Sequence, residues 1–242
     1  MNPDNNLISV VIPAFNEEEK ISDCLEFLVA QKTGYIFEVI VVDNNSTDKT
    51  VAVATRFQSR LNLRIISEHQ QGRGAARAAG FNSAQGQIIL STDADTIAPP
   101  NWVEAMVGAL KKTNAPAVTG AVMINDLLDW RGRFFNWFWP KWNWFYWRLF
   151  GNYFISGFSF AVYKETYECV GGFNPNLQAM EDLDLGFRLN KLGKIVFLPT
   201  PAVAFSGRRF KGSVFKGLWE YFFQFLCYYF SGKQKGYLSD VR

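Results

Sequence analysis

Short β-branched runs that alternate with helical patterns are the feature that most constrains this chain. Each run has the length of a buried parallel strand. The runs lie at residues 8–12, 37–42, 63–66 and 87–90. Between them, apolar residues recur at three- and four-residue spacing, as in Ile21, Cys24, Leu25 and Leu28. This order predicts an α/β fold, a mostly parallel sheet with helices on both faces.

The same patterns place the remaining elements. Helices are expected at residues 17–32, 47–60, 73–85, 99–112 and 181–192. Further strands are expected at residues 117–123, 155–163, 194–198 and 202–205. The sequence has no repeat and no low-complexity linker, so we expect one α/β domain over residues 1–210. Residues 211–242 form an amphipathic C-terminal extension in this interpretation.

Composition and charge narrow the class of protein. The net charge of +3 is too small for a dedicated nucleic-acid binder. The three cysteines are far apart and odd in number, which favours a reducing compartment. A polar start, Met1 to Asn6, leads directly into the first strand without a signal-peptide pattern. We therefore expect a cytoplasmic catalytic domain.

Polar side chains follow three of the expected strands. They are Asn16 and Glu17, then Asp43, and then Asp93 and Asp95. Ligands of open α/β sheets bind beyond the carboxyl ends of the strands. We therefore expect these side chains to meet in one cleft.

The pair Asp93 and Asp95 is the strongest local feature. Residues two apart on an extended chain point the same way, and two adjacent carboxylates repel unless a cation lies near them. Hard oxygen ligands suit Mg²⁺ or Mn²⁺, which typically join one or two carboxylates to substrate phosphates. Taken alone, the Asp-x-Asp motif is also typical of a turn or a helix cap.

Several motifs occur together in a fixed order. They are Val10–Glu17, Val41–Asp48, Gly72–Arg77, Ile88–Asp95, Val170–Phe173 and Glu181–Asp182. In this set the chain resembles the family 2 glycosyltransferases, from about Ile8 to Phe205. The resemblance implies a GT-A fold and a metal-dependent, inverting transfer from a nucleotide sugar.

The resemblance also implies a role for each matching residue. The turn with Pro13, Ala14, Phe15 and Glu17 would line the nucleotide pocket, and Asp43 would hydrogen-bond the base, typically a uracil. Arg77 and Glu181 would lie on the nucleotide side, and Asp93 would contact the ribose. Asp95 would be the metal ligand and Asp182 the general base. The acids at 181–182 also suit a helix N-terminus, because they offset its dipole, and both interpretations can hold.

Two positions depart from the family pattern. Ala78 follows Arg77, where the family often has Asn. No late His is present as an extra metal ligand, because the single His69 lies far upstream. Arg208 and Arg209 stand near the matching place and are predicted to clamp phosphate oxygens, or else to form a solvated basic turn. We expect His69 on an exposed loop.

Aromatic residues crowd residues 134–150, with Lys141 and Arg148 among them and Arg131 and Arg133 just before them. An apolar acceptor pocket, a membrane-interface anchor and internal packing against the tail all fit, and aromatic rings can also stack on sugars. The tail, residues 214–230, suits a helix lying on a membrane surface or packed on the protein. We hypothesise peripheral contact with the inner face of the cytoplasmic membrane, where a saccharide or lipid-linked acceptor would reach Asp182.

Two other functions compete with this interpretation. A sugar-phosphate nucleotidyltransferase normally has a Gly-rich loop with a lysine after the first strand, whereas this chain has Pro13–Glu17 there. A non-catalytic sugar-nucleotide-binding scaffold would not need Asp93, Asp95 and Asp182 together. The sequence favours a UDP-sugar donor and a hydroxyl or phosphate acceptor, and leaves the sugar, the acceptor and the oligomeric state open.

Overall fold

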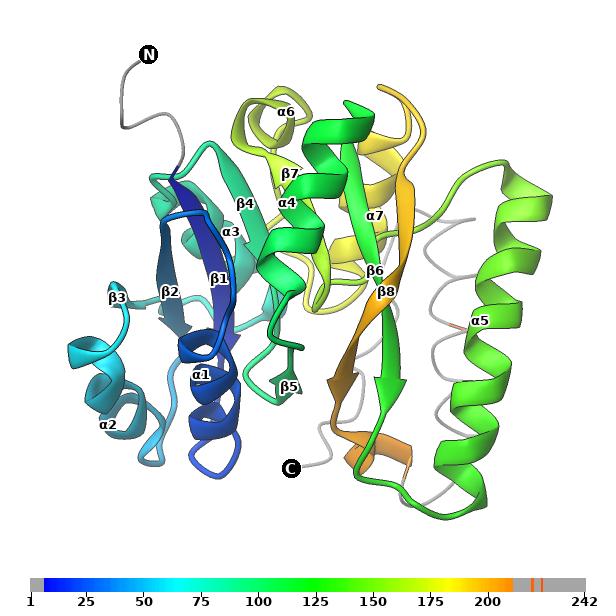
Figure 1. The fold of residues 1–242 in the computed structure, drawn as a ribbon. Coiled ribbons are helices and arrows are strands. Elements are labelled where there is room, and N and C mark those ends of the chain that lie inside the picture. Colours follow the sequence, from blue (N-terminus) through cyan, green and yellow to red (C-terminus); the bar gives the residue numbers. More distant parts are fainter. Residues whose placement is uncertain (1–6, 211–218, 220–222, 224–242) are drawn as a thin grey trace.

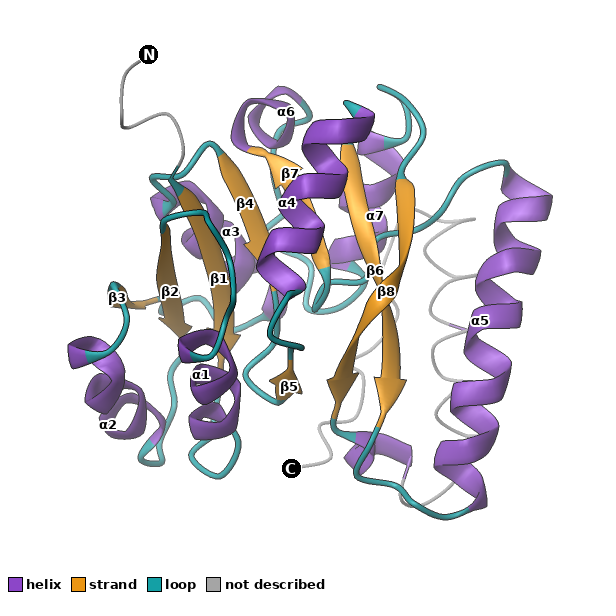
Figure 2. Cartoon of the chain, viewed as in Figure 1, coloured by secondary structure: helices purple, strands orange, loops and turns teal. Residues whose placement is uncertain are grey.

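The computed structural model describes residues 7–210 together with Trp219 and Phe223. An eight-stranded sheet with the order β3-β2-β1-β4-β7-β6-β8-β5 forms its centre (Figures 1 and 2). The strands are β1 (Ile8–Ala14), β2 (Phe37–Asp43), β3 (Leu63–Ser67), β4 (Ile88–Ser91), β5 (Thr96–Ile97), β6 (Ala117–Ile124), β7 (Phe160–Tyr163) and β8 (Val196–Phe205). The α-helices are α1 (Ile21–Val29), α2 (Thr50–Thr55), α3 (Arg73–Ser83), α4 (Trp102–Thr113), α5 (Trp130–Phe150), α6 (Lys164–Cys169) and α7 (Glu181–Leu189). The 3₁₀ helices are η2 (Arg56–Ser59) and η3 (Gly207–Phe210).

The N-terminal half of the sheet is parallel and in register. β1 pairs with β2 so that Ala14 lies opposite Asp43, and β4 pairs with β1 so that Ser91 lies opposite Val11. The polar residues that follow these strands therefore leave the same edge of the sheet, as the sequence predicted. β7 runs antiparallel between β4 and β6, whereas β6 and β8 are parallel.

Helices cover both faces of the sheet because side chains alternate along each strand. Val10 and Ile12 join the core cluster that contains Trp102 of α4 and the buried residues of α1. Val11, between them, points to the opposite cluster, where Phe81 of α3 stacks on Phe160 with ring centroids 5.7 Å apart. The predicted α/β architecture is confirmed.

Three predicted strands differ from the structure. The strand expected at residues 155–163 is restricted to β7, because residues 155–159 form a loop whose backbone serves the site described below. The strands expected at 194–198 and 202–205 are one strand, β8, whose register against β6 shifts between Gly120 and Val122. Pro199 and Pro201 fall within this irregularity, where a missing backbone N–H is tolerated.

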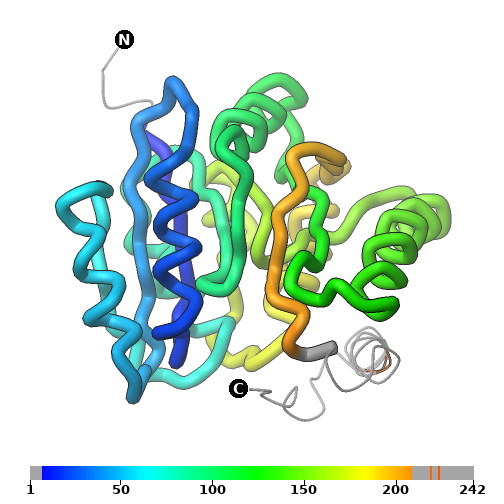
Figure 3. Tube along the Cα trace, turned by 60° about the horizontal axis from the view of Figure 1, so that its bottom comes forward, coloured from blue at the N-terminus to red at the C-terminus, as the bar shows by residue number. Residues whose placement is uncertain are grey.

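The aromatic segment is a 21-residue helix, α5. Asp129 caps its N-terminus, and the Asp129 side chain accepts a hydrogen bond from the Arg131 N–H. Figures 1 and 3 show α5 at the end of the molecule opposite α2. Within the described part of the chain, no helix has the length and apolarity needed to cross a membrane. The predicted tail helix at residues 214–230 lies outside the described residues, apart from Trp219 and Phe223.

Candidate active site

The loops after β1 and β2 are tied to each other. Asn16, at a φ of 53°, accepts a hydrogen bond from the Thr47 N–H at 2.8 Å, and its own N–H donates to Ser46 Oγ at 3.0 Å. The Glu17 N–H donates to Thr50 Oγ1 at 2.7 Å. Asn is among the few residues that adopt this left-handed backbone at low cost. The turn after Pro13 is therefore fixed before any ligand arrives.

A second set of hydrogen bonds joins the end of β2 to the Gly-rich segment, residues 72–77. Asp43 ends β2 and is 9% exposed, and its Oδ1 accepts from the Ser46 N–H at 3.3 Å. Asn44 Oδ1 accepts from the Gly72 N–H at 2.8 Å, just before α3 begins. Gly74 must lack a side chain, because a Cβ there would lie 2.5 Å from the carbonyl oxygen of Leu177. The Gly-rich segment thus seats α3 against residues 174–177.

Arg77 of α3 is the buried centre of the site. Its Nη1 donates to Ser91 Oγ and its Nη2 to Asp93 Oδ1, both at 2.7 Å, and its Nε donates to Glu181 Oε1 at 3.0 Å. Burial lowers the pKa of Arg77, but the carboxylates of Asp93, Glu181 and Asp182 outweigh burial and raise it. Arg77 therefore joins the end of β4 to the start of α7. Its predicted contact with the nucleotide stays a prediction, because these three nitrogens donate to protein groups here.

Asp182 is the second residue of α7, and the helix follows Met180, which has a left-handed φ of 61°. Its Oδ2 accepts from the Gly157 N–H at 3.0 Å and its Oδ1 from the Leu183 N–H at 2.8 Å. Burial, followed by the neighbouring Glu181 carboxylate, raises the pKa of Asp182 to about 6, despite the opposing effect of Arg77. A carboxyl tuned in this way suits a general base near neutral pH.

Arg208 bridges two further acids across the sheet edge. Its Nη2 lies 2.5 Å from Glu17 Oε1 and 3.0 Å from Asp95 Oδ2. Burial and then the Asp93 carboxylate raise the pKa of Asp95 to about 6, although Arg208 lowers it. The structure thus connects the turn after β1, the Asp-x-Asp motif and the end of β8. The side chain of Arg209 lies outside what the structure describes.

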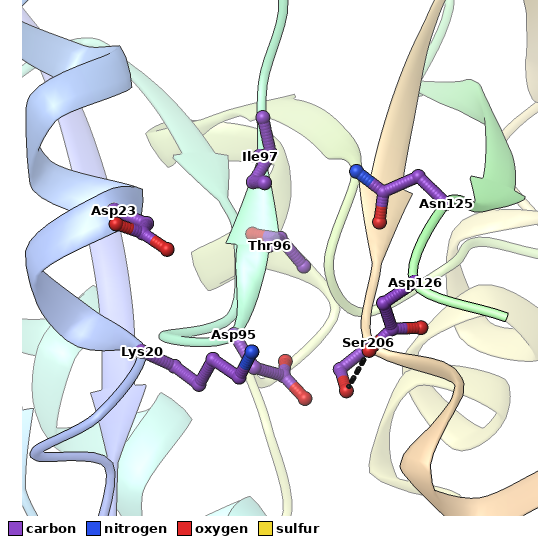
Figure 4. Close-up of a pocket in the computed structure, with 8 residues that line it drawn as sticks. All are labelled: Lys20, Asp23, Asp95, Thr96, Ile97, Asn125, Asp126 and Ser206. Atoms are coloured by element: carbon purple, nitrogen blue, oxygen red, sulfur yellow. Dashed lines mark hydrogen bonds between the residues drawn. The ribbon is translucent and has the colours of Figure 1, made fainter. Parts of the chain in front are cut away.

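A pocket of about 140 Å³ opens beside Asp95. Figure 4 shows Lys20 and Asp23 of the α1 region on one side, and Asp126 and Ser206 on the other. Ser206 Oγ donates to Asp126 Oδ2 at 2.7 Å, and the Gly207 N–H donates to Asp126 Oδ1 at 2.6 Å. Asp126 therefore holds the turn from which Arg208 extends.

Glu17 and Asp95 supply carboxylate oxygens, which are the type of ligand that a hard divalent ion prefers. Both carboxylates converge on one cationic atom, Nη2 of Arg208, and Mg²⁺ is usually held by one or two carboxylates plus substrate phosphates. Across residues 7–210, no group of three or more His, Cys, Asp or Glu side chains is placed to hold a metal. A metal here would depend on a ligand for the rest of its coordination.

The sequence predicted most of the charged residues of this cluster, but not the residues that position Asp182 and Arg208. Gly157 and Asp126 were missed, because their roles depend on a backbone N–H and on a turn 80 residues away. Pro13 and Ala14, which were expected in the turn, are the last residues of β1, and the turn begins at Phe15. His69 is exposed, as expected.

Comparison with solved structures identifies the fold. The solved structures of S. aureus TarS in complex with UDP-GlcNAc and of the mannosyltransferase PcManGT from Pyrobaculum calidifontis in complex with GDP-Man and Mn²⁺ superpose with TM-scores of 0.66 and 0.65. Identity is 18% and 22%; the alignments cover 82% and 81% of this chain, and 58% and 56% of those chains. The curled sheet flanked by helices is the GT-A fold of glycosyltransferases.

Sequence comparison gives the family. The model of glycosyl transferase family 2 matches residues 9–169, and the chain belongs to that family. Glycosyltransferase AglE of Haloferax volcanii is 38% identical over 120 residues, and dodecaprenyl-phosphate galacturonate synthase of Rhizobium johnstonii is 33% identical over 118. These matches cover 48% and 47% of this chain, but only 39% and 35% of the relatives. The chain thus matches well under half of each relative's length.

Proposed function

We propose that this chain is an inverting glycosyltransferase that moves a sugar from a UDP-sugar to a hydroxyl or phosphate of a lipid-linked or cell-envelope saccharide acceptor. The observation that supports it best is the pair of arginine bridges. Arg77 connects Asp93 to Glu181, and Arg208 connects Glu17 to Asp95, so the acids that follow β1 and β4 are tied to each other and to the start of α7.

Donor binding belongs to the edge formed by β1, β2 and β4. Asp43 is the proposed partner of the uracil N3–H, and the tied turn from Pro13 to Glu17 lines the base and ribose. Asp93, 32% exposed at its side chain, is the proposed ribose contact. The fold neighbours support a nucleotide-sugar donor, because TarS is described with UDP-GlcNAc and PcManGT with GDP-Man.

The chemistry belongs to Asp182. With a hydroxyl acceptor, the oxygen of the acceptor hydroxyl bonds to the anomeric carbon of the donor sugar. At the same time the bond from that carbon to the β-phosphate oxygen breaks. The acceptor proton passes to Asp182, and the bonding electron pair leaves with UDP. A positioned base of this kind contributes roughly 10²–10⁴-fold. A single displacement inverts the anomeric carbon.

The leaving diphosphate needs positive charge around it. Arg208 is the proposed donor of two parallel hydrogen bonds to phosphate oxygens, an arrangement that the planar guanidinium favours. A Mg²⁺ or Mn²⁺ ion bound at Asp95 and Glu17 would add Lewis-acid stabilisation of the leaving group. PcManGT supports this assignment, since its structure is described with Mn²⁺.

Acceptor binding belongs to the side of α5. Phe154 contacts Trp139 and Tyr146 of α5, with ring centroids 5.8 and 5.2 Å apart, and it packs against the cluster of Met180 and Leu183 that flanks Asp182. The aromatic helix thus borders the proposed base. The name of the Rhizobium relative, a dodecaprenyl-phosphate galacturonate synthase, supports a lipid-phosphate acceptor.

The outer face of α5 supports contact with a lipid surface at the cytoplasmic side of a membrane. Trp130, Trp137 and Trp144 are each about 60% exposed and lie at helical spacing. Lys141 lies 4.0 Å above the Trp137 ring, and residues 130–150 contain no acid. Trp beside basic residues suits the interface of an anionic bilayer.

Ligand-dependent stability tests the donor assignment. Unfolding temperatures are measured with UDP-, GDP- and other sugar nucleotides, each with Mn²⁺ or Mg²⁺, because a ligand that binds only the folded state stabilises it. A UDP-sugar that raises the unfolding temperature is then tested for UDP release with polyprenyl phosphate and with saccharide acceptors. Stabilisation by none of the sugar nucleotides would contradict the proposed function.

A further inference from the structure

Arg208 lies where two carboxylates of the proposed donor site converge. Glu17 is 6% exposed and Asp95 is 17% exposed at the side chain, so neither acid is well solvated. Two such carboxylates side by side repel each other unless a positive charge lies between them. In the structure the Arg208 guanidinium supplies that charge. A divalent ion that used the same oxygens would need the same place.

We propose that Arg208 is a resident cation of the donor site, and that it exchanges with a divalent metal ion when a nucleoside diphosphate binds. This inference rests on the proposed function, because it assigns a ligand to the same site. Without nucleotide, Arg208 neutralises Glu17 and Asp95. The diphosphate then draws the guanidinium onto its own oxygens, and the two carboxylates become available to the metal.

The backbone of the turn that carries Arg208 is held by hydrogen bonds, whereas the Arg208 side chain is partly exposed to solvent. Asp126 accepts hydrogen bonds from Ser206 Oγ and the Gly207 N–H, which anchors the turn at the start of η3. Gly207 is also packed closely, since a Cβ there would lie 2.7 Å from Ile124 Cγ2. The Arg208 side chain is 28% exposed. Asp126 is therefore a positioning residue that aims a movable cation at the site.

The exchange couples two ligands. If UDP removes Arg208 from Asp95, UDP must tighten metal binding, and the metal must tighten UDP binding by the same factor. A metal that coordinates both Asp95 and the diphosphate adds a direct contribution to this coupling. Only the part of the coupling that depends on Arg208 disappears when the guanidinium is removed.

Mn²⁺ binding to the full chain, followed by the electron paramagnetic resonance signal of free Mn²⁺, tests the exchange without any turnover. Without UDP, Arg208→Gln is expected to bind Mn²⁺ at least about fivefold more tightly than the wild type. UDP is expected to tighten Mn²⁺ binding more in the wild type than in Arg208→Gln. Arg131→Gln is the matched control, because Arg131 is 27% exposed and also pairs with a carboxylate. It should behave as the wild type does.

Two further variants keep the test decisive if Arg208→Gln does not fold, which circular dichroism would reveal. Arg208→Lys keeps the charge and should bind Mn²⁺ as weakly as the wild type. Asp126→Asn loosens the turn and should bind Mn²⁺ more tightly than the wild type. Where Arg208→Gln does fold, adding Asp95→Asn to it should abolish the gain in Mn²⁺ affinity.

Mn²⁺ affinity that is equal in wild type and Arg208→Gln would overturn the exchange. If Arg208→Gln does not fold, equal affinity in wild type and Asp126→Asn would overturn it. Calorimetric titration of the wild type with UDP and with the sugar nucleotides separates this failure from that of the proposed function. UDP binding together with unchanged Mn²⁺ affinity removes only the exchange, whereas a wild type that binds no sugar nucleotide removes the proposed function.

Discussion

Asp182 Oδ2 accepts a hydrogen bond from the Gly157 backbone N–H at 3.0 Å. A loop that the sequence pattern assigned to a strand therefore aims the proposed base. The same glycine lies against Arg77, because a Cβ at position 157 would lie 2.8 Å from Arg77 Nη2 and 3.2 Å from Asp182 Oδ2. One residue thus sets the spacing between the base and the buried guanidinium.

Gly157→Ala should impair both folding and turnover. The added methyl group has no room beside Arg77 and Asp182, and overpacking of this kind costs about 1–3 kcal/mol of unfolding free energy. Urea unfolding and UDP release measure the two effects. Gly34→Ala is the control, because no atom lies within 4 Å of its Cβ. Wild-type stability and turnover in Gly157→Ala would contradict this geometry.

Arg77→Met should destabilise the fold strongly. It leaves the carboxylates of Asp93 and Glu181 without their shared partner, and an uncompensated buried charge costs roughly 3–5 kcal/mol. Arg60→Met is the comparison, because Arg60 pairs with Glu26 at the surface, where both side chains are nearly half exposed. A surface pair contributes little to stability, because water and salt screen it. Equal unfolding midpoints in urea for the two variants would refute the central role of Arg77.

Turnover should fall as the pH decreases through about 6, because Asp182 acts as a base only when ionised and its pKa is raised to about 6. The same shift affects stability. A carboxyl whose folded-state pKa lies above its ordinary value of 3.8 favours folding while protonated, and this contribution is lost as the pH rises through about 6. Asp182→Asn should therefore raise the unfolding temperature at pH 8 more than at pH 4. An equal change at both pH values would argue against the raised pKa.

The exposed face of α5 should bind anionic vesicles. The double variant Trp137→Ala and Trp144→Ala should weaken the binding of phosphatidylglycerol vesicles by at least about tenfold, since burying one large apolar side chain contributes about 1.5–3 kcal/mol. Co-sedimentation measures the effect. Ile36→Ala is the control, because Ile36 is 72% exposed and lies outside α5. Vesicle binding that is unchanged in the double variant would show that this face of α5 is not the site of lipid contact.

Periodicity was enough to predict the sheet and the acids at its edge. The runs before Glu17, Asp43 and Asp93 are parallel strands whose carboxyl ends lie together, because buried β-branched runs have few other ways to pack. The helix start at Glu181 also follows the prediction, since acids in a first turn offset the helix dipole.

Other parts needed tertiary information. The helix α5 was not predicted, because Trp, Phe and Tyr are common in strands and Pro140 lies inside the segment. Phe135 and Tyr146 are buried and fix the helix by packing. The contact between Arg208 and Asp95 spans 113 residues, and no sequence spacing encodes it.

The most direct test of Asp182 as the general base is UDP release from a saturating UDP-sugar with a hydroxyl acceptor, measured for the wild type and for Asp182→Asn. We predict that Asp182→Asn binds UDP as the wild type does and releases UDP about 10²–10⁴-fold more slowly. Release by Asp182→Asn within threefold of the wild-type rate, a difference of about 0.7 kcal/mol, would contradict the assignment of Asp182 as the base.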